Sequence, residues 1–204
     1  MIDGKKRIGI YGGTFAPPHN GHVAAAAAFF EQMKLDELLI IPASIPPHKQ
    51  IDFSDNPEHR LNMCRLAFEG MEGVRVSDIE IARGGRSYTV DTLWQLYSPD
   101  RKLFLLCGTD MMLTFDQWRD FQTIFKLCCP VYMRRERDSA LDAQIIEKNN
   151  YYYKNFGVAF RRILADPVVI SSSEIRKIIR DNGNITEYIP PQVEKYIREN
   201  KLYV

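Results

Sequence analysis

Apolar runs of strand length recur along the chain, separated by longer segments in which apolar and polar residues are mixed. The runs are continuous or alternating and lie at residues 7–11, 38–42, 74–81, 103–107, 129–133 and 166–170. Segments of helical length lie between most of them, so the order strand, helix, strand repeats. This order predicts an α/β fold with a parallel sheet, right-handed crossovers and helices on both faces.

Helices are expected at residues 23–30, 55–69, 90–97, 138–153 and 192–200, with a further helix opening within 171–176. Asn56 and Pro57 mark a helix start, because asparagine caps free N–H groups and proline suits the first helical turn. The residues beyond 168 are expected to add a small C-terminal helical part to the sheet. The chain contains no internal repeat or low-complexity tract, so residues 1–204 are expected to form a single domain.

Residues 8–22, IGIYGGTFAPPHNGH, combine a strand, a glycine turn and a helix start. The glycine pair at 12–13 is expected to end the strand and to turn the chain tightly, since glycine has no Cβ. Asn20 is expected to cap the helix that follows. His19 and His22 would then lie at a helix N-terminus, where free N–H groups and the helix dipole favour an anion. The anion we expect is the triphosphate of a nucleotide.

The two histidines also admit a purely structural interpretation. In it, His19 caps the helix locally and His22 is a satisfied, half-buried histidine. A zinc site is a weaker alternative, because no cluster of His, Cys or Asp lies nearby in the sequence with metal-ligand spacing. We therefore expect no metal site built from protein side chains.

Polar residues follow the carboxyl ends of other predicted strands, which is where open α/β sheets bind ligands. Lys49 lies in the proline-rich loop after strand 38–42 and could give positive charge to a phosphate or simply be solvated. Ser87 and Thr89 precede helix 90–97. They could cap that helix or present hydroxyl and N–H groups to a second ligand.

The strand at 103–107 is followed by Gly108 and Asp110. A carboxylate at this position suits ribose hydroxyls, because it accepts two hydrogen bonds. Thr109 or Asp110 could also cap the helix that follows. Trp118, further along, could stack on a flat ring, although a lone tryptophan more often packs in a core.

Residues 171–176, SSSEIR, are expected to form a second polar helix start. Ser172 or Ser173, with the acid that follows, resembles a capping arrangement. Arg176 could form a fork to two phosphate oxygens. This helix start therefore also suits a phosphate group.

Composition indicates which class of protein this is and which partners are unexpected. The 204 residues, 45% hydrophobic and 26% charged, suit one globular domain with a substantial core. A net charge of +1 gives no global field for nucleic acid, and no apolar run is long enough to span a membrane. The four cysteines show no disulfide framework, so we expect them reduced and mostly buried. We expect a cytoplasmic protein without nucleic-acid or membrane partners and without a secretory signal.

Five stretches of the chain together resemble the bacterial nicotinate-nucleotide adenylyltransferases, a family of the HxGH nucleotidylyltransferase superfamily. They follow the family's order and spacing: GGTFAPPHNGH (12–22), PASIPPHK (42–49), SYTVDTL (87–93), GTD with a later tryptophan (108–110 and 118) and ISSSEIR (170–176). The resemblance implies a Rossmann-like fold and transfer of AMP from ATP to nicotinate mononucleotide. The products would be nicotinate adenine dinucleotide and pyrophosphate, with Mg²⁺ bound together with ATP.

Carried over by position, the resemblance also implies site residues. The ATP phosphates would be contacted by His19, His22, Ser172 and Arg176. The nucleotide cleft would be lined by Gly12, Gly13, Thr14 and Phe15. The adenosine ribose would be held by Gly108 and Asp110, and the adenine would be faced by the backbone around Ile170 and Ser171. The nicotinate ring would be held by Ser87, Tyr88, Thr89 and Trp118, with Arg119 beside them and Lys49 near the phosphates.

Two positions depart from the family pattern. Ala16 stands where the family usually has aspartate, which removes a polar side chain. Arg119 follows Trp118 where an aromatic residue is common. The second departure falls in the expected ring pocket.

Two other functions compete with this interpretation. Another nucleotidylyltransferase of the same superfamily, such as the phosphopantetheine enzyme, is the nearest, although SYTVDTL and Trp118 favour a pyridine ring. A nucleotide-binding sensor without catalysis is the second, and intact His19, His22 and Arg176 argue against it. The sequence leaves open whether the chain forms a homo-oligomer.

Overall fold

The central element is a six-stranded parallel sheet with the order β3-β2-β1-β4-β5-β6. The computed structural model describes residues 4–47, 56–134, 140–164 and 170–204. Its strands are β1 (Lys6–Gly13), β2 (Glu37–Pro42), β3 (Val74–Val76), β4 (Arg101–Gly108), β5 (Cys128–Met133) and β6 (Arg161–Ile163). The chain builds outward from β1 to β3 and then returns to β4 on the other side of β1. This reversal is the position at which Rossmann-like sheets bind ligands, beyond the carboxyl ends of the strands.

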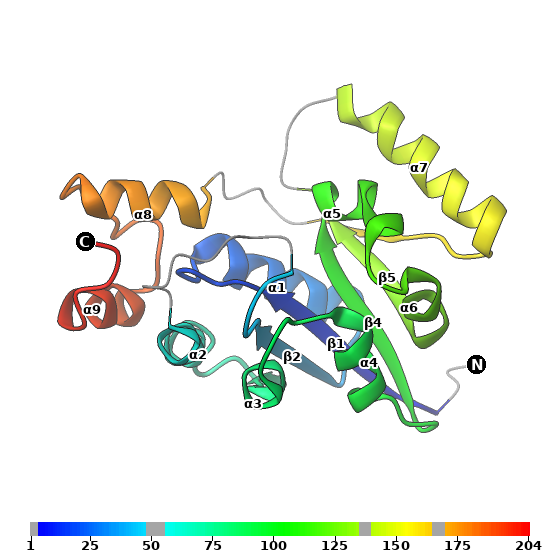
Figure 1. The fold of residues 1–204 in the computed structure, drawn as a ribbon, viewed down its shortest axis with the longest axis horizontal. Helices are drawn as coiled ribbons and strands as arrows, with labels where there is room; N and C mark the ends of the chain where they lie inside the picture. The colour runs from blue at the N-terminus through cyan, green and yellow to red at the C-terminus, as the bar shows by residue number, and fades with distance from the viewer. Residues whose placement is uncertain (1–3, 48–55, 135–139, 165–169) are drawn as a thin grey trace.

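Helices connect the strands and cover both faces of the sheet (Figure 1). They are α1 (Asn20–Gln32), α2 (Pro57–Ala67), α3 (Ile79–Arg83), α4 (Thr89–Leu96), α5 (Thr109–Leu113), α6 (Phe121–Leu127), α7 (Ala140–Phe156), α8 (Ser172–Arg180) and α9 (Pro191–Glu199), with a 3₁₀ turn at Phe115–Gln117. Helices α8 and α9 form the expected C-terminal helical part and lie on the same side as α1 and α2 (Figure 1). The predicted α/β fold is therefore confirmed.

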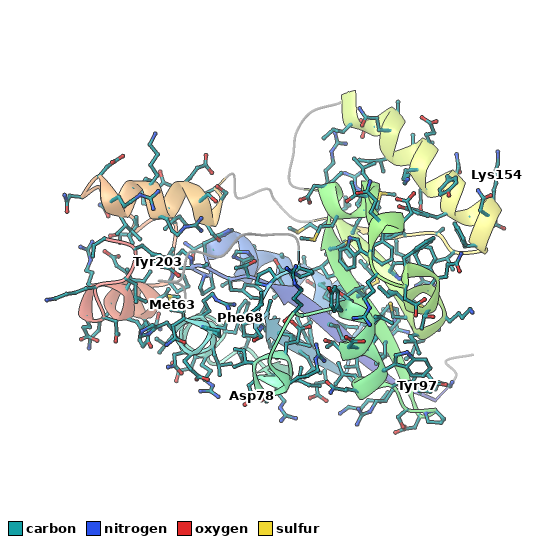
Figure 2. All side chains as sticks on the ribbon, viewed as in Figure 1. Met63, Phe68, Asp78, Tyr97, Lys154 and Tyr203 are labelled. Atoms are coloured by element: carbon teal, nitrogen blue, oxygen red, sulfur yellow. The ribbon has the colours of Figure 1, made fainter. Side chains whose placement is uncertain are left out.

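Each face of the sheet has its own hydrophobic core. The first core lies under α1, α2, α8 and α9, and the second lies under α4, α6 and α7. Neighbouring residues of one strand alternate between them: Leu38 faces the first core and Leu39 the second. Met63 and Phe68, labelled in Figure 2, belong to the first core. Because both faces are covered, the middle parts of β1, β2, β4 and β5 are buried, as expected for a parallel sheet.

Close packing fixes the height of α1 over β1. A Cβ added to Gly9 of β1 would lie 2.3 Å from Leu35 Cδ1 and 3.0 Å from Phe29 Cε1. Only glycine lets the helix and the turn that follows it approach the strand so closely. The start of α1 is thereby held above the carboxyl end of β1.

One strand prediction is wrong at its end, and another lies mostly outside the described residues. The strand expected at 74–81 stops at Val76, and Ile79–Arg83 forms α3 instead. The alternation of that segment did not reflect pairing, because buried Glu80 is held inward by a hydrogen bond from Thr92. Of the strand expected at 166–170, residues 166–169 lie outside the described residues and Ile170 is not in a strand. The edge strand β6 lies earlier, at Arg161–Ile163, where two arginines hide the apolar signal.

Candidate active site

Strand β1 ends where the strand order reverses, and it runs further than the sequence predicts. Gly12 and Gly13 remain in the sheet, in register with Ile41 and Pro42 of β2. The glycine turn expected at 12–13 is therefore wrong. The chain turns instead at Phe15, whose φ of 52° lies in the left-handed region.

Gly13 is nevertheless required by close packing. A Cβ at this position would lie 3.0 Å from the ring of Phe15, so the missing side chain lets the ring fold back on the strand. The Phe15 ring packs edge-on against Tyr11 and His22, with centroid distances of 5.4 and 5.0 Å. These contacts hold residues 14–19, which we call the β1 exit segment, against the start of α1.

The start of α1 brings the two predicted histidines together in a buried position. Their ring centroids are 3.7 Å apart. The N-cap is His19 rather than the expected Asn20, and its main-chain N–H donates to Nδ1 of His22 at 3.2 Å. Because Nδ1 accepts this bond, the neutral ring carries its proton on Nε2. The histidines therefore do take part in capping α1. The bond to Nδ1 also fixes the orientation of the His22 ring toward a ligand.

The N-terminus of α8 is closed by a capping box one residue earlier than predicted. Ser171, rather than Ser172 or Ser173, is the N-cap: its Oγ accepts from the N–H of Glu174 at 3.2 Å. The Glu174 carboxylate accepts in return from the Ser171 N–H and hydroxyl, both at 2.7 Å. These hydrogen bonds from Ser171 hold the pKa of Glu174 below its usual value. Nearby His19 lowers this pKa further through its charge.

The first turn of α8 is tied to the β1 exit segment, although 155 or more residues separate them in the sequence. Ser172 Oγ donates to the carbonyl of Pro17 at 2.9 Å, and Arg176 Nη1 donates to the carbonyl of Ala16 at 2.7 Å. Arg176 Nη2 also donates to Ser173 Oγ at 3.2 Å. The arginine thus bonds the main chain at position 16, so alanine there still supports this contact. Ser172 and Arg176 are thereby brought to the histidine side of the segment.

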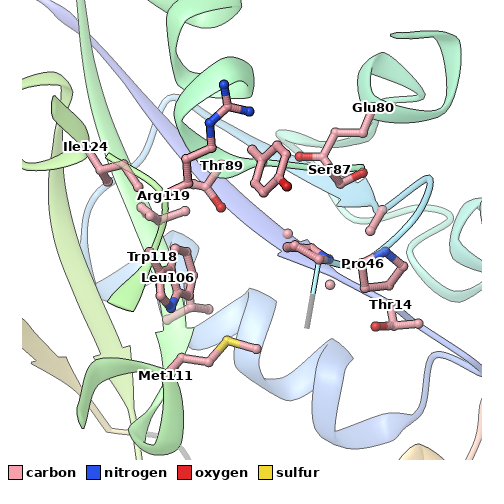
Figure 3. Close-up of a pocket in the computed structure, with 16 residues that line it drawn as sticks. Thr14, Pro46, Glu80, Ser87, Thr89, Leu106, Met111, Trp118, Arg119 and Ile124 are labelled. Carbon is pink, nitrogen blue, oxygen red and sulfur yellow. The ribbon is translucent and has the colours of Figure 1, made fainter. Parts of the chain in front are cut away.

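Beside Thr14, where the β1 exit segment begins, the structure contains a cavity of about 130 Å³. It gathers the predicted residues Gly12, Gly13, Thr14, Ser87, Tyr88, Thr89, Trp118 and Arg119. It is completed by residues that the sequence did not single out: Ala43, Pro46, Pro47, Glu80, Leu105, Leu106, Met111 and Ile124. Trp118 and Met111 face Pro46 and Thr14 across the cavity (Figure 3). The cavity is mostly apolar with a few polar groups, as small-molecule sites usually are.

One wall of the cavity is aromatic and cationic. Trp118 is half-buried, and its ring stacks on Phe115 at 4.6 Å between centroids. Part of its surface therefore packs in the core, as the alternative interpretation expects, and part lines the cavity. Arg119 lies over the ring of Tyr88, 4.5 Å from its centroid. Its Nη1 is also 3.7 Å from Asp91 Oδ2. Aromatic faces and a guanidinium therefore meet at the start of α4.

The opposite wall contains a buried hydrogen-bond network. The Ser44 N–H donates to Ser87 Oγ at 2.8 Å, and Glu80 accepts hydrogen bonds from Ser87 and from Thr92, the latter at 2.6 Å. Glu80 lies beside Ser87 in Figure 3. Burial raises the pKa of Glu80, and these hydrogen bonds and the charge of Arg83 only partly offset it. Because its hydroxyl is engaged here, Ser87 does not cap α4.

The N-terminus of α4 differs from the expected arrangement. Its N-cap is Tyr88, which makes no side-chain capping bond, and Thr89 is the first helical residue. The expected caps at Ser87 or Thr89 are therefore wrong. Thr89, the first helical residue, lines the cavity, so the first turn of α4 borders it.

Gly108 and Asp110 lie at the carboxyl end of β4, next to the end of β1 in the sheet. Gly108 is the N-cap of α5, and Asp110 is exposed in the first turn. The expected capping by Thr109 or Asp110 is wrong, since Thr109 Oγ1 donates to the carbonyl of Met133 at 3.4 Å. The Asp110 carboxylate is therefore placed at the switch point on the solvent side.

Two predicted residues have little structural description. Lys49 lies outside the described residues. Ile170 is described as half-buried, next to the N-cap of α8, and it packs against the first core. Ile170 lies beside α8 because it directly precedes the N-cap residue in the sequence.

Arg60 is a buried residue that the sequence analysis missed. It lies on α2, is 0% exposed, and its guanidinium bonds to the carbonyls of Thr14, Ala43 and Ser44. Its burial could have been predicted from its position on the apolar face of the helix, four residues before buried Cys64. An arginine on such a stripe indicates a buried polar contact.

Within the described residues, no group of three or more His, Cys, Asp or Glu side chains is arranged to hold a metal ion. Among the helices of the same residues, none combines the length and apolarity needed to cross a membrane. The four cysteines are free, and Cys64, Cys107 and Cys128 are buried, as expected. Burial raises the pKa of the Cys64 and Cys128 thiols, which leaves them unreactive.

Comparison with solved structures supports the fold. The chain superposes with a TM-score of 0.76 on a Plasmodium falciparum nicotinic acid mononucleotide adenylyltransferase solved with NaAD, at 21% identity and 97% coverage of both chains. The same enzyme solved with APC gives a TM-score of 0.74. At this level of identity the likeness establishes the architecture.

Sequence comparison establishes the family. Residues 10–178 match the cytidylyltransferase-like family model. The chain is 34% identical to a protein of Desulfatibacillum aliphaticivorans described as "probable nicotinate-nucleotide adenylyltransferase", over 97% of this chain and 100% of that protein. A protein of Clostridium acetobutylicum with the same description is 35% identical, over 98% of this chain and 100% of its own length. The chain therefore belongs to the nicotinate-nucleotide adenylyltransferases of the cytidylyltransferase-like family.

Proposed function

We propose that the protein transfers AMP from ATP to nicotinate mononucleotide, forming nicotinate adenine dinucleotide and pyrophosphate in NAD synthesis. The observation that carries this proposal is the arrangement around the β1 exit segment. A cavity with an aromatic wall lies beside Thr14, where the segment begins. The segment ends at His19, which pairs with His22, and Arg176 donates to it at Ala16. One short segment therefore connects a candidate site for a flat ring with a candidate site for phosphates.

We assign the triphosphate of ATP to the histidine side. His19 and His22 lie at the N-terminus of a 13-residue helix, where free N–H groups and the helix dipole favour an anion. His22 presents Nε2–H as its donor, because its Nδ1 accepts from the His19 main chain. Ser172 and Arg176 would add a hydroxyl and a guanidinium from α8, and the guanidinium matches the geometry of two phosphate oxygens.

We assign the remaining parts of the substrates by position. Gly12, Gly13, Thr14 and Phe15 would line the nucleotide cleft, and Gly108 and Asp110 would hold the adenosine ribose. The backbone at Ile170 and Ser171 would face the adenine, and Lys49 would lie near the phosphates. In the cavity, Trp118 and Tyr88 would pack on the pyridine ring, with the main chain at Thr89 and the side chain of Arg119 at its polar end.

The reaction requires no covalent intermediate with the protein. An oxygen of the mononucleotide phosphate attacks the α-phosphorus of ATP and forms the new P–O bond. The opposite bond, from the α-phosphorus to the oxygen that bridges to the β-phosphorus, breaks and releases pyrophosphate. The protein must hold two anions in line and neutralise charge as it develops on the leaving group. His19, His22 and Arg176 serve as electrostatic stabilisers rather than as proton carriers.

Mg²⁺ would enter as part of the substrate MgATP. This ion prefers phosphate oxygens and water, with at most one or two carboxylates. When bound, Mg²⁺ neutralises the charge of the pyrophosphate that leaves.

We further propose that residues 1–204 act as a single domain in the cytoplasm. The two hydrophobic cores share one sheet, which supports one folding unit. The four cysteines are free, which suits a reducing compartment.

The proposal is tested by offering the purified protein MgATP with nicotinate mononucleotide, nicotinamide mononucleotide or phosphopantetheine. We expect pyrophosphate and dinucleotide with the nicotinate compound, and little product with the amide. The first turn of α4 and Arg119 give positive potential at the cavity, which favours a carboxylate over an amide. Turnover with phosphopantetheine alone would replace the proposed acceptor, and ATP binding without any turnover would identify a sensor.

A further inference from the structure

The buried guanidinium of Arg60 connects two loops that end neighbouring strands of the sheet. Its Nη1 donates to the carbonyls of Thr14, at 3.0 Å, and Ala43, at 2.5 Å. Its Nη2 donates to the carbonyl of Ser44 at 2.8 Å. Thr14 begins the β1 exit segment, whereas Ala43 and Ser44 belong to residues 43–47, which we call the β2 exit loop. One side chain on α2 thus joins the ends of β1 and β2.

Both joined loops form walls of the cavity, but Arg60 does not. Thr14 and Ala43 line the cavity directly, and Arg60 is not among the lining residues. Beyond Ser44 the connection continues, because the Ser44 N–H donates to Ser87 Oγ, and Ser87 donates to Glu80. A change at Arg60 would therefore reach the ring cavity through Thr14, Ala43 and Ser44.

The energetics of this arrangement favour a role beyond core stability. Burying a charged group is unfavourable unless its donors are satisfied, and an apolar side chain of similar volume is often at least as stabilising. The guanidinium is suited to the position because its planar fork reaches several carbonyls at fixed angles. A methionine would fill similar space without any donor, and a lysine would keep the charge without the planar fork.

We propose that Arg60 is a positioning residue for the adenylyl transfer, and that it sets the spacing between the phosphate side and the ring side of the site. The inference rests on the proposed function. The β1 exit segment carries contacts to Arg176 at Ala16 and to α1 at His19. The β2 exit loop carries the wall opposite Trp118. Holding the two at one distance aligns the mononucleotide phosphate with the α-phosphorus of ATP.

The test compares Arg60→Met and Arg60→Lys with Arg65→Met and Arg65→Lys. Arg65 lies on the same helix, is exposed, and donates to Asn62 Oδ1 at 3.2 Å, so it serves as the matched control. For each variant kcat, the KM of both substrates and the midpoint of thermal unfolding are measured. Displacing reacting groups by about 1 Å reduces turnover about 10²-fold, so we expect a loss of that size in kcat for Arg60→Met. Arg60→Lys should fall between it and the parent chain, and both Arg65 variants should match the parent chain.

The split between the constants separates positioning from stability. A positioning role predicts that kcat per folded molecule falls more than the KM for ATP changes, while the variant remains folded at the assay temperature. An Arg60→Met protein with the kcat of the parent chain would overturn the proposal, as would failure of both Arg60 variants to fold. Failure of the proposed function is distinguished by the parent chain itself, which would then form no dinucleotide in the same assay.

Discussion

The main-chain N–H of His19 donates to Nδ1 of His22 at 3.2 Å. This bond makes the backbone of one predicted catalytic residue the orienting group of the other. It assigns the proton of the neutral His22 ring to Nε2, so that His22 presents a donor, and not an acceptor, to a phosphate oxygen. The two histidines therefore act as one unit built into the first turn of α1.

Substitutions of His22 separate the roles of its two nitrogens. We expect His22→Ala to fold and to lose about 10²–10³ in kcat, the usual effect of removing one donor to developing charge. His22→Gln should retain more activity than His22→Asn, because the glutamine amide reaches closer to the position of Nε2. Steady-state kinetics of the three proteins check this order. Equal or higher activity of His22→Asn would show that the Nε2 donor is not what the reaction uses.

His59 provides the matched control for these histidine variants. It lies on α2, where its Nδ1 is 2.9 Å from the hydroxyl of Tyr196 on α9. His59→Gln should change the stability of the α2–α9 contact and leave kcat unchanged. A parallel loss of kcat in both proteins would indicate a general effect of histidine replacement.

Trp118 and Trp94 allow a direct test of ring stacking. Trp118 lines the cavity, whereas Trp94 lies on the outside of α4 with 56% of its surface exposed. An aromatic stack contributes about 0.5–1.5 kcal/mol. We therefore expect Trp118→Ala to raise the KM for nicotinate mononucleotide about 2- to 10-fold, with little change in the KM for ATP. Trp94→Ala should change neither constant.

Fluorescence checks the same prediction by binding. In a Trp94→Phe protein, Trp118 is the one remaining tryptophan of the chain, which has two. Nicotinate mononucleotide should quench its emission in a saturable way. Emission that does not respond to saturating mononucleotide would place the ring elsewhere.

Arg176 is expected to bind the triphosphate, and Arg180 is its control on the same helix. Removing a charged hydrogen-bond donor costs about 1.5–3 kcal/mol, so Arg176→Ala should lower kcat/KM for ATP about 10- to 100-fold. Arg180 is exposed in the last turn of α8, and Arg180→Ala should leave this constant unchanged. Arg176→Ala also removes the bond to Ala16, so its unfolding midpoint is measured alongside. Equal kinetics of the two variants would contradict the assignment.

Burial of Glu80 predicts a pH dependence of stability. Its pKa is raised above the ordinary value of 4.5, first by burial. A carboxyl with a higher pKa in the folded chain binds more protons when folded, so the free energy of unfolding falls as pH rises through the interval between the two values. Glu80→Gln should lack this fall. The difference in unfolding midpoint between the variant and the parent chain should therefore shift in the variant's favour as pH is raised from about 4.5 toward neutral.

Glu69→Gln, which replaces an exposed glutamate in the turn after α2, is the control for this pH series. It should follow the parent chain at every pH. A Glu80→Gln protein whose midpoint runs parallel to that of the parent chain would show that the buried carboxyl carries no such penalty.

The order of strands and helices could be predicted from the sequence because both faces of this sheet are covered. Runs such as Leu38 to Ile41 are apolar on both sides, and the intervening segments have helical length. The edge strands were less predictable, because they are short and lack continuous apolar runs. Strand β6 begins with two exposed arginines, and the alternation after Val76 belongs to the short helix α3. At an edge, pairing is decided by the neighbouring strand rather than by the local pattern.

Site residues could be predicted where the residue type itself carries the chemistry. They were harder to predict where tertiary packing determines the conformation. The histidine pair, Arg176 and Trp118 could be chosen from motifs. The turn at Phe15 could not, because it depends on ring contacts with Tyr11 and His22. Arg60 was also missed, since its three acceptors are main-chain carbonyls, which any sequence provides. Its role exists only once two strand ends are brought side by side.

A crystal structure of the protein with nicotinate adenine dinucleotide would show directly where the ring and the phosphates bind. We expect the pyridine ring in the cavity against Trp118, and the phosphates within hydrogen-bond distance of His22 and Arg176. A ring bound outside the cavity, or phosphates that contact neither His22 nor Arg176, would contradict this expectation.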